Sequence, residues 1–252
     1  MLIDSHAHLL SLENMQNVID NMKNDGLEFI INASTTMEDS TAGVKLAKSN
    51  KNIYTLIGLY PEYAAEWNDD YEKVLNQLAK ESKVVGIGEI GLDYHGENVD
   101  REKQIEVFEK QIKIAYNNNL PICIHCRNAA EDVYNILCKN KYIFENGVLM
   151  HCFSEDMEYT KKFLEIGCYF SFSGNITYKK VDTERIKEIG VDRLLIETDC
   201  PYLSPIPLRG TKNIPANVVY TAQKMADILE MPLDRFTNIV VNNAKKVFKR
   251  IK

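Results

Sequence analysis

The sequence lacks the features that mark a membrane protein or a protein that coats nucleic acid. No apolar run approaches the roughly 20 residues that a helix needs to cross a bilayer, and no basic segment followed by an apolar stretch resembles a secretory signal. Lys and Arg number 30 against 36 Asp and Glu, so the net charge is -6. Because coating of long nucleic acids usually needs a basic excess, any contact with nucleic acid should be local. We expect a cytoplasmic protein that does not bind membranes.

Six cysteines in a chain of 252 residues give little support for disulfides. A large chain without a secretion signal usually keeps its thiols reduced and buried. Cys123 and Cys126 have C-x-x-C spacing, but residues three apart on a strand face opposite ways. We therefore expect this pair to share neither a metal ion nor a disulfide.

Short apolar runs alternate with longer amphipathic segments along the whole chain. The strand-like runs are residues 2–5, 28–33, 53–58, 84–87, 121–124, 148–150, 168–171 and 194–197. They are nearly continuous in apolar residues, which is typical of parallel strands covered on both faces. Strand and helix alternating about eight times in about 250 residues predict a (β/α)8 TIM barrel. An open doubly wound sheet is the alternative.

The segments between the runs have helical periodicity. Ile105, Phe108 and Ile112 recur on one face of residues 101–117, which predicts a helix there. Residues 215–249 read as two further helices that close the chain. Since no linker or shift in composition interrupts the pattern, we predict a single domain over residues 1–252.

Histidine is scarce, but four of the five histidines lie at or just past the end of an apolar run. The C-terminal ends of barrel strands converge on one mouth, where such folds build their sites. A lone histidine after a strand is usually a cap or a surface residue, yet this shared placement favours a metal site at the mouth. The residues so placed are His6, His8, Glu89, His125, His151 and Asp199.

These residue types suit divalent metal ions. His6 and His8 are two apart, so on a strand they point the same way and could hold one ion. Imidazole and carboxylate ligands suit zinc or manganese better than magnesium. Four histidines and two carboxylates exceed the needs of one open site and are enough for two ions with a bridging carboxylate. Two such cations stabilise both the attacking and the leaving oxygen of a displacement at phosphorus.

Taken together, the motifs resemble the TatD family of metal-dependent deoxyribonucleases, within the wider amidohydrolase-like barrels. The matching stretches occur in order over essentially the whole chain. They are IDSHAHL (3–9), GIGEIGLDY (86–94), PICIHCR (121–127), MHCFS (150–154), SFSGNITYK (171–179) and LLIETDCPYLSPIPLRGTKNIP (194–215).

The resemblance implies two divalent metal ions, zinc, manganese or magnesium, and a role for each ligand. One ion would be held by His6, His8 and Asp199, the other by His125 and His151, and Glu89 would bridge both. It also implies that Asp199 accepts a proton from the attacking water. Glu89 and Asp199 are therefore the expected catalytic residues.

Substrate contacts are expected from basic and aromatic side chains near these motifs. Arg127 follows His125 by two, so it lies on the same face and could bind a phosphate oxygen bidentately. Arg209 and Lys212 are candidates for further phosphate contacts. His95, in GLDYHG, is expected to be a loop residue that faces substrate or solvent.

The chain departs from the family pattern after the third predicted strand. The family often has His-Pro-His there, whereas this chain has Tyr60, Pro61 and Glu62. Metal binding should survive, because those histidines are not among the six ligands. Tyr60 could stack on a base, and Glu62 would repel a nearby phosphate, so substrate preference is expected to differ.

The resemblance implies that the protein hydrolyses phosphodiester bonds in DNA. We expect a monomeric exonuclease that acts on single-stranded or frayed ends, including a 3′ end. Related barrels cleave amides and esters, many with a carbamylated lysine where this chain has Glu89, which favours the nuclease without excluding an aminoacyl ester on tRNA. A non-catalytic metal-binding partner in DNA repair is the other alternative. The complete set of six metal ligands argues against this alternative. A measurement of bound metal would discriminate between the two, because a non-catalytic partner need not hold two ions.

Overall fold

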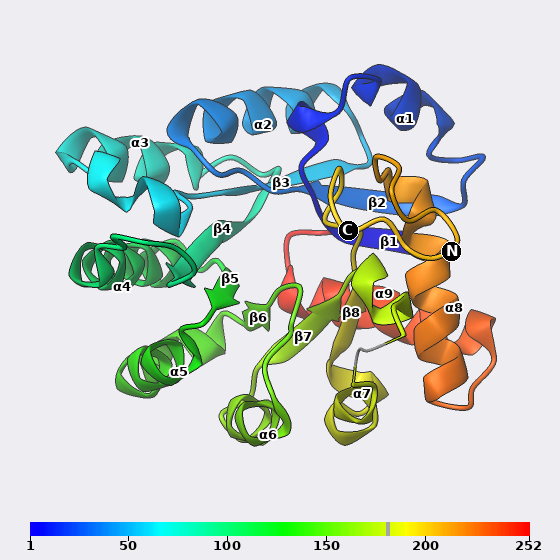
Figure 1. Ribbon diagram of the computed structural model, residues 1–252. Coiled ribbons are helices and arrows are strands. Elements are labelled where there is room, and N and C mark those ends of the chain that lie inside the picture. Colours follow the sequence, from blue (N-terminus) through cyan, green and yellow to red (C-terminus); the bar gives the residue numbers. More distant parts are fainter. Residues whose placement is uncertain (180–181) are drawn as a thin grey trace.

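The computed structural model describes residues 1–179 and 182–252, and these form a parallel eight-stranded barrel ringed by helices (Figure 1). The strands lie in the order of the chain, which confirms the predicted TIM barrel and not the doubly wound alternative. Between the last and the first strand, the Ser5 hydroxyl donates to the Ile196 carbonyl at 2.9 Å. The strands are β1 (Leu2–Ala7), β2 (Leu27–Asn32), β3 (Ile53–Ile57), β4 (Val84–Asp93), β5 (Ile122–Arg127), β6 (Val148–Met150), β7 (Tyr169–Phe172) and β8 (Leu194–Ile196).

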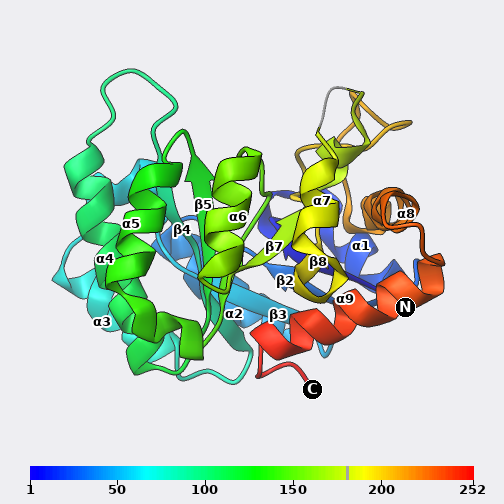
Figure 2. The same cartoon turned by 90° about the horizontal axis from the view of Figure 1, so that it is seen from below.

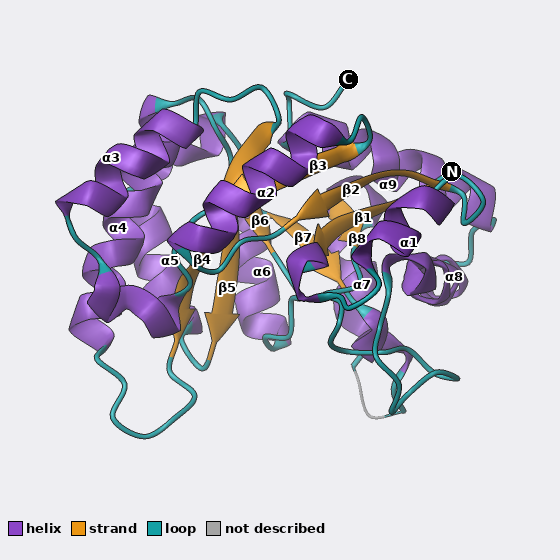
Figure 3. Ribbon diagram, turned by 90° about the horizontal axis from the view of Figure 1, so that it is seen from above, coloured by secondary structure: helices purple, strands orange, loops and turns teal. Residues whose placement is uncertain are grey.

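The helices pack around the outside of the strands (Figure 3). The helix predicted over residues 101–117 has those bounds, and the two helices predicted to close the chain are present. The Asp100 side chain caps the helix at residues 101–117 by accepting from the Lys103 N–H at 2.9 Å. In the described residues, no helix is long and apolar enough to span a membrane. The helices are α1 (Met15–Asn21), α2 (Met37–Ser49), α3 (Asp69–Leu78), α4 (Arg101–Asn117), α5 (Ala130–Lys139), α6 (Met157–Glu165), α7 (Glu184–Ile189), α8 (Val218–Ile228) and α9 (Leu233–Val247).

The C-terminal segment covers the N-terminal end of the barrel. The Arg250 guanidinium donates to the carbonyls of Ala79 at 2.8 Å and Val84 at 2.9 Å, and Val84 begins β4. In Figure 2, α9 lies on one side of the molecule, and the long loops after β4 and β8 extend on the other. The C-terminal ends of the strands are therefore left free to carry the functional loops.

Strand β4 is longer than predicted. It continues to Asp93, whereas the predicted strand ends at Ile87. Residues 87–90 of β4 face residues 122–124 of β5, so one extra residue bulges from β4. Glu89 lies in this bulge, within the strand and not at its end. A bulge re-aims a side chain, and here it coincides with the residue expected to bridge two metal ions.

Asp4 and Thr198 tie β1 to the segment after β8. The Asp4 carboxylate accepts from the Thr198 N–H at 2.9 Å and from the Thr198 hydroxyl. Burial raises the pKa of Asp4 to about 8, although these hydrogen bonds lower it. Just beyond, the Asp199 N–H donates to the His6 carbonyl at 3.0 Å. These bonds hold Asp199 beside His6.

Candidate metal centre

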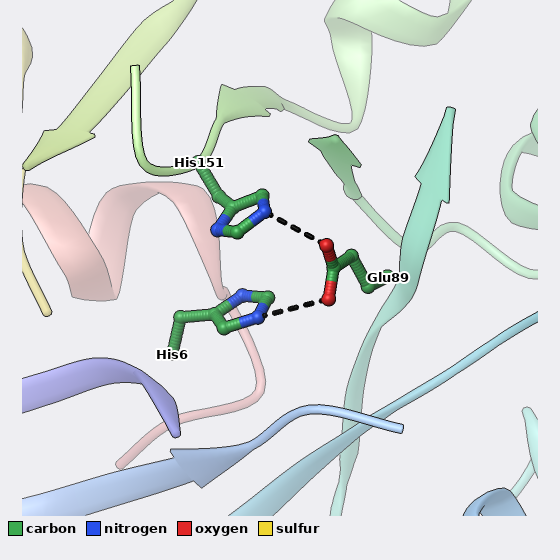
Figure 4. Close-up of side chains that lie close together, drawn as sticks. All are labelled: His6, Glu89 and His151. Carbon is green, nitrogen blue, oxygen red and sulfur yellow. Dashed lines mark hydrogen bonds and ion pairs between the residues drawn. The ribbon is translucent and has the colours of Figure 1, made fainter. Parts of the chain in front are cut away.

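Glu89 lies between two pairs of histidines. Its Oε1 atom is 3.0 Å from His125 Nδ1 and 2.9 Å from His151 Nε2. Its Oε2 atom is 3.3 Å from His6 Nε2 and 3.6 Å from His8 Nε2. Figure 4 shows one histidine of each pair, with His6 and His151 each linked to a different oxygen of Glu89. The carboxylate thus divides the four imidazoles as a bridging ligand would, with one oxygen for each pair.

Asp199 adds a second carboxylate on the side of His6 and His8. Its Oδ1 atom is 3.3 Å from His8 Nε2 and 3.9 Å from His6 Nε2. Two groups of three residues place their ligand atoms within 4.8 Å of one another, namely His6, Glu89 and His151, and His6, His8 and Asp199. All six residues expected as ligands are brought together. Their roles as ligands stay a prediction.

The donor atoms at this centre fit a divalent cation. His6 is fully buried, and its Nε2 atom makes no hydrogen bond within the described part of the chain, although it faces Glu89 and Asp199. Its ring stacks on that of His151 with centroids 4.0 Å apart. Buried polar atoms are rarely left unpaired, because the loss of water is costly. A cation between His6 and the carboxylates would satisfy this nitrogen.

Proximity shifts the pKa values of the cluster in opposite directions. Burial alone would raise the pKa of Glu89, but His151 and His125 hold it well below its usual range. Burial would lower the pKa of His151, but Glu89 and Glu197 raise it well above the usual value. The pKa of His6 is lowered, first by burial and then by the charge of His151. The carboxylates thus favour the charged form of His151, whereas burial favours the neutral form of His6.

These shifts predict that metal binding releases protons. Against the effect of burial, carboxylates raise the pKa of His8 and of His125, as they do for His151. Each imidazole therefore keeps its proton to a higher pH than a free one, and must lose it to bind a cation. We expect zinc affinity to rise with pH above about 6.5, the ordinary pKa of histidine. Calorimetry in two buffers of different ionisation enthalpy counts the protons. Equal enthalpies in both buffers, with pH-independent affinity, would contradict this.

Two acidic residues that the sequence analysis missed hold the outer nitrogens of the histidines. His125 Nε2 is 2.9 Å from Asp93 Oδ2, and His151 Nδ1 is 3.4 Å from Glu197 Oε1. Such carboxylates fix the tautomer and orientation of metal-binding imidazoles. The signal was present, since Asp93 is the last but one residue of the GIGEIGLDY motif and Glu197 stands in LLIETDC.

Replacing Asp93 with asparagine is expected to lower zinc affinity by about 10 to 100-fold. The change keeps the shape of the side chain but removes the charge that orients His125. Competition with a chromophoric chelator measures the affinity. Asp132→Asn is the control, because Asp132 accepts from the Tyr94 hydroxyl at 2.8 Å and does not touch the centre. Equal affinity in the two variants would rule out this role for Asp93.

Tyr60 belongs to the same network. Its hydroxyl donates to Asp93 Oδ2 at 3.1 Å and lies 3.2 Å from His125 Nε2. Burial, followed by the charges of Glu89 and Asp93, raises its pKa far above the usual value, so the hydroxyl stays protonated. The tyrosine that replaces the usual family histidine thus supports a histidine of the centre.

The centre opens into a pocket of about 530 Å³. Arg127 and Tyr60 line it, as expected of substrate contacts. Arg209 and Lys212 are not among its lining residues. Arg209 lies 4.6 Å from the centre of the Tyr178 ring, and Lys212 pairs with Glu13. The lining consists of His8, Ser11, Thr35, Tyr60, Glu62, Tyr63, Glu89, His125, Cys126, Arg127, His151, Cys152, Ser154, Asn175, Asp199, Tyr202 and Leu203.

Comparison with known proteins shows the family of the chain. Residues 3–249 match the family described as TatD related DNase. The chain is 38% identical to the uncharacterized metal-dependent hydrolase YabD of Bacillus subtilis, with 99% of both proteins covered. It is 33% identical to the uncharacterized metal-dependent hydrolase YcfH of Escherichia coli K12, with 98% of this chain and 95% of that protein covered.

A solved structure has the same architecture. The crystal structure of YJJV, a TatD homologue from Escherichia coli K12, superposes with a TM-score of 0.92 at 25% identity, and 98% of each chain is covered. The match to the family extends from β1 to the end of α9. The chain is therefore a metal-dependent hydrolase that belongs to the family of TatD related DNases.

Proposed function

We propose that the protein hydrolyses phosphodiester bonds in DNA, as an exonuclease on single-stranded or frayed ends. The observation that carries the proposal is the position of Glu89, with one carboxylate oxygen toward each pair of histidines. Such a divided carboxylate suits two cations that act on one phosphate. The family description, TatD related DNase, supports DNA as the substrate.

Each side chain of the centre has a proposed task. His6, His8 and Asp199 would hold one divalent ion, His125 and His151 would hold the other, and Glu89 would serve both. Zinc or manganese suits these nitrogen-rich donors better than magnesium. Bound divalent cations offset negative charge at phosphorus and lower the pKa of a water molecule.

Asp199 handles the proton of the attacking water. Burial would raise the pKa of Asp199, but the hydrogen bond from His8 and its charge lower it. The carboxylate is therefore free of a proton before the reaction and can accept one from water. Its side chain is 15% exposed and lines the pocket, so water can reach it.

The charge of the pocket favours a brief engagement at a strand end. Among the described residues that line it, Arg127 is the only one with a permanent positive charge, and the same lining holds the carboxylates of Glu62, Glu89 and Asp199. Two divalent cations would reverse the balance locally. A groove for extended DNA would need a row of basic side chains along the DNA backbone. Within the described residues, the lining of this pocket has no basic side chain with a permanent charge besides Arg127.

All six proposed ligands come from one chain, so the centre needs no second copy. We propose a monomer that works in the cytoplasm. Size-exclusion chromatography with light scattering tests the first point. Fractionation of cells that produce the protein tests the second.

Arg127→Ala is expected to raise KM for DNA by roughly tenfold and to leave kcat nearly unchanged. Arg127 is exposed in the pocket, and a guanidinium binds phosphate oxygens bidentately. The loss affects ground state and transition state alike, so it appears in KM. The KM of Arg127→Lys should lie between the KM of the wild type and that of Arg127→Ala. An unchanged KM in Arg127→Ala would remove this contact from the proposal.

The test of the function is a nuclease assay on protein stripped of metal. End-labelled single-stranded and duplex DNA is offered with zinc, manganese or magnesium restored in turn. We expect a ladder of shortened products that requires a metal ion, starts at one end and is stronger on single strands. No cleavage by protein that holds two ions would overturn the proposal. Carboxyl esters, including an aminoacyl ester on tRNA, would then be the substrates to assay.

A further inference from the structure

The aromatic side chain expected to stack on a base is not the one best placed to do so. The Tyr60 hydroxyl is engaged by Asp93, and the Tyr60 ring stands edge to face with that of His125, with centroids 4.8 Å apart. Tyr60 is therefore held as part of the metal centre. Two other tyrosines line the same pocket and expose more of their side chains to solvent.

Tyr63 and Tyr202 are these two residues. Tyr63 is 37% exposed and Tyr202 is 59% exposed, and both are among the exposed large hydrophobic side chains of the described residues. Tyr202 lies beside His8, with ring centroids 6.0 Å apart, and Tyr63 lies 6.5 Å from Tyr60. Both rings therefore offer aromatic surface to a ligand in the pocket.

The two tyrosines and Arg127 reach the pocket from three different places on the barrel mouth. Tyr63 belongs to the short 3-10 helix Pro61–Glu66 that follows β3, and Tyr202 follows β8. Around the barrel, β8 and β3 are three strands apart, and β5, which Arg127 ends, is two strands from β3 and three from β8. Two aromatic rings and one guanidinium thus surround the pocket, with Glu89 and Asp199 in the same lining.

We propose that Tyr63 and Tyr202 bind the terminal nucleobase of the strand by stacking, while Arg127 and the metal centre hold its phosphate. This inference rests on the proposed function. Stacking on aromatic rings suits single strands and ends, because a paired base inside a duplex does not offer its faces. It also tolerates any base, since every base has a π-face. The pocket volume of about 530 Å³ is within the range that encloses a small ligand.

The test combines a change in the protein with a change in the DNA. Metal-loaded protein is titrated with short single strands that carry phosphorothioate linkages to slow cleavage. The terminal residue is either 2-aminopurine, whose fluorescence is quenched by stacking, or an abasic sugar. Tyr63→Leu and Tyr202→Leu remove the ring, and Tyr63→Phe and Tyr202→Phe keep it. Tyr116→Leu is the control, because Tyr116 is 39% exposed but does not line the pocket.

We expect quenching by the wild-type protein and an approximately tenfold weaker Kd for the abasic strand. In each leucine variant the quenching and the difference in Kd between the two DNA strands should largely vanish. Removing the ring and removing the base break the same contact, so the second change should add little to the first. The phenylalanine variants and Tyr116→Leu should behave as the wild type.

Two results would overturn the inference. The first is a wild-type protein that cleaves single-stranded DNA but binds both strands equally and without quenching, which would leave the proposed function intact. The second is a pair of leucine variants that keep the full difference between strands. A wild-type protein that neither binds nor cleaves any DNA would end the proposed function, and the base site with it.

Discussion

Replacing Glu89 with glutamine is expected to remove metal ions from both proposed positions and to reduce hydrolysis by about a thousandfold or more. Glutamine has nearly the same shape, so the barrel should persist. It lacks the charge that balances His125 and His151 at one oxygen and His6 and His8 at the other. Because one carboxylate serves both pairs, the two ions should be lost together.

Metal content by plasma mass spectrometry, measured beside the nuclease rate, checks this expectation. Glu155→Gln is the matched control, since Glu155 accepts a weak hydrogen bond from Cys126 at 3.6 Å and pairs with none of the histidines. The control should keep its metal and its activity. A Glu89→Gln variant that retains two ions would show that the histidines hold them without a bridge.

The second large effect is expected from Asp199→Asn. Removing a positioned proton acceptor typically costs about 10² to 10⁴-fold in rate. The amide cannot take a proton from water, whereas Arg127 and the pocket walls still bind DNA. We therefore expect kcat to fall by about this factor while Kd for DNA changes by no more than about threefold.

Single-turnover kinetics and fluorescence anisotropy separate these two quantities. Metal content must be measured in the same samples, because Asp199 lies 3.3 Å from His8 and is also a proposed ligand. If retained metal accompanies equal losses in kcat and DNA affinity, Asp199 does not handle the proton.

The barrel could be predicted because each strand carries its signal locally. Parallel strands buried on both faces must be apolar throughout, and the runs at residues 53–58 and 148–150 mark β3 and β6 closely. The end of β4 could not be predicted in this way. It runs on to Asp93, because residues 90–93 pair with β5 although Glu89 and Asp93 break the apolar run.

The inner residues of the centre could be predicted for a similar reason. His6, His125 and His151 come directly after apolar runs, and the topology of a barrel brings such positions together. Asp93 and Glu197 were missed because their function lies in a contact with another side chain, a hydrogen bond to His125 for Asp93 and a 3.4 Å approach to His151 for Glu197. That contact depends on the bulge in β4 and on packing between strands distant in sequence.

The role of Tyr60 could not be predicted, because it depends on side-chain geometry. From the sequence, a tyrosine in place of a family histidine indicates a change of substrate contact. In the structure its hydroxyl reaches Asp93 and His125. Tyr63 and Tyr202 are 139 residues apart, and only the closed order of the strands places them in one pocket.

Anomalous X-ray diffraction from crystals of zinc-loaded protein tests the central claim most directly. The account predicts two peaks a few ångströms apart, on either side of the Glu89 carboxylate. One peak should lie beside His6, His8 and Asp199, and the other beside His125 and His151. A single peak, or peaks that leave Glu89 bound to neither ion, would contradict a bridged centre and the two-cation hydrolysis built on it.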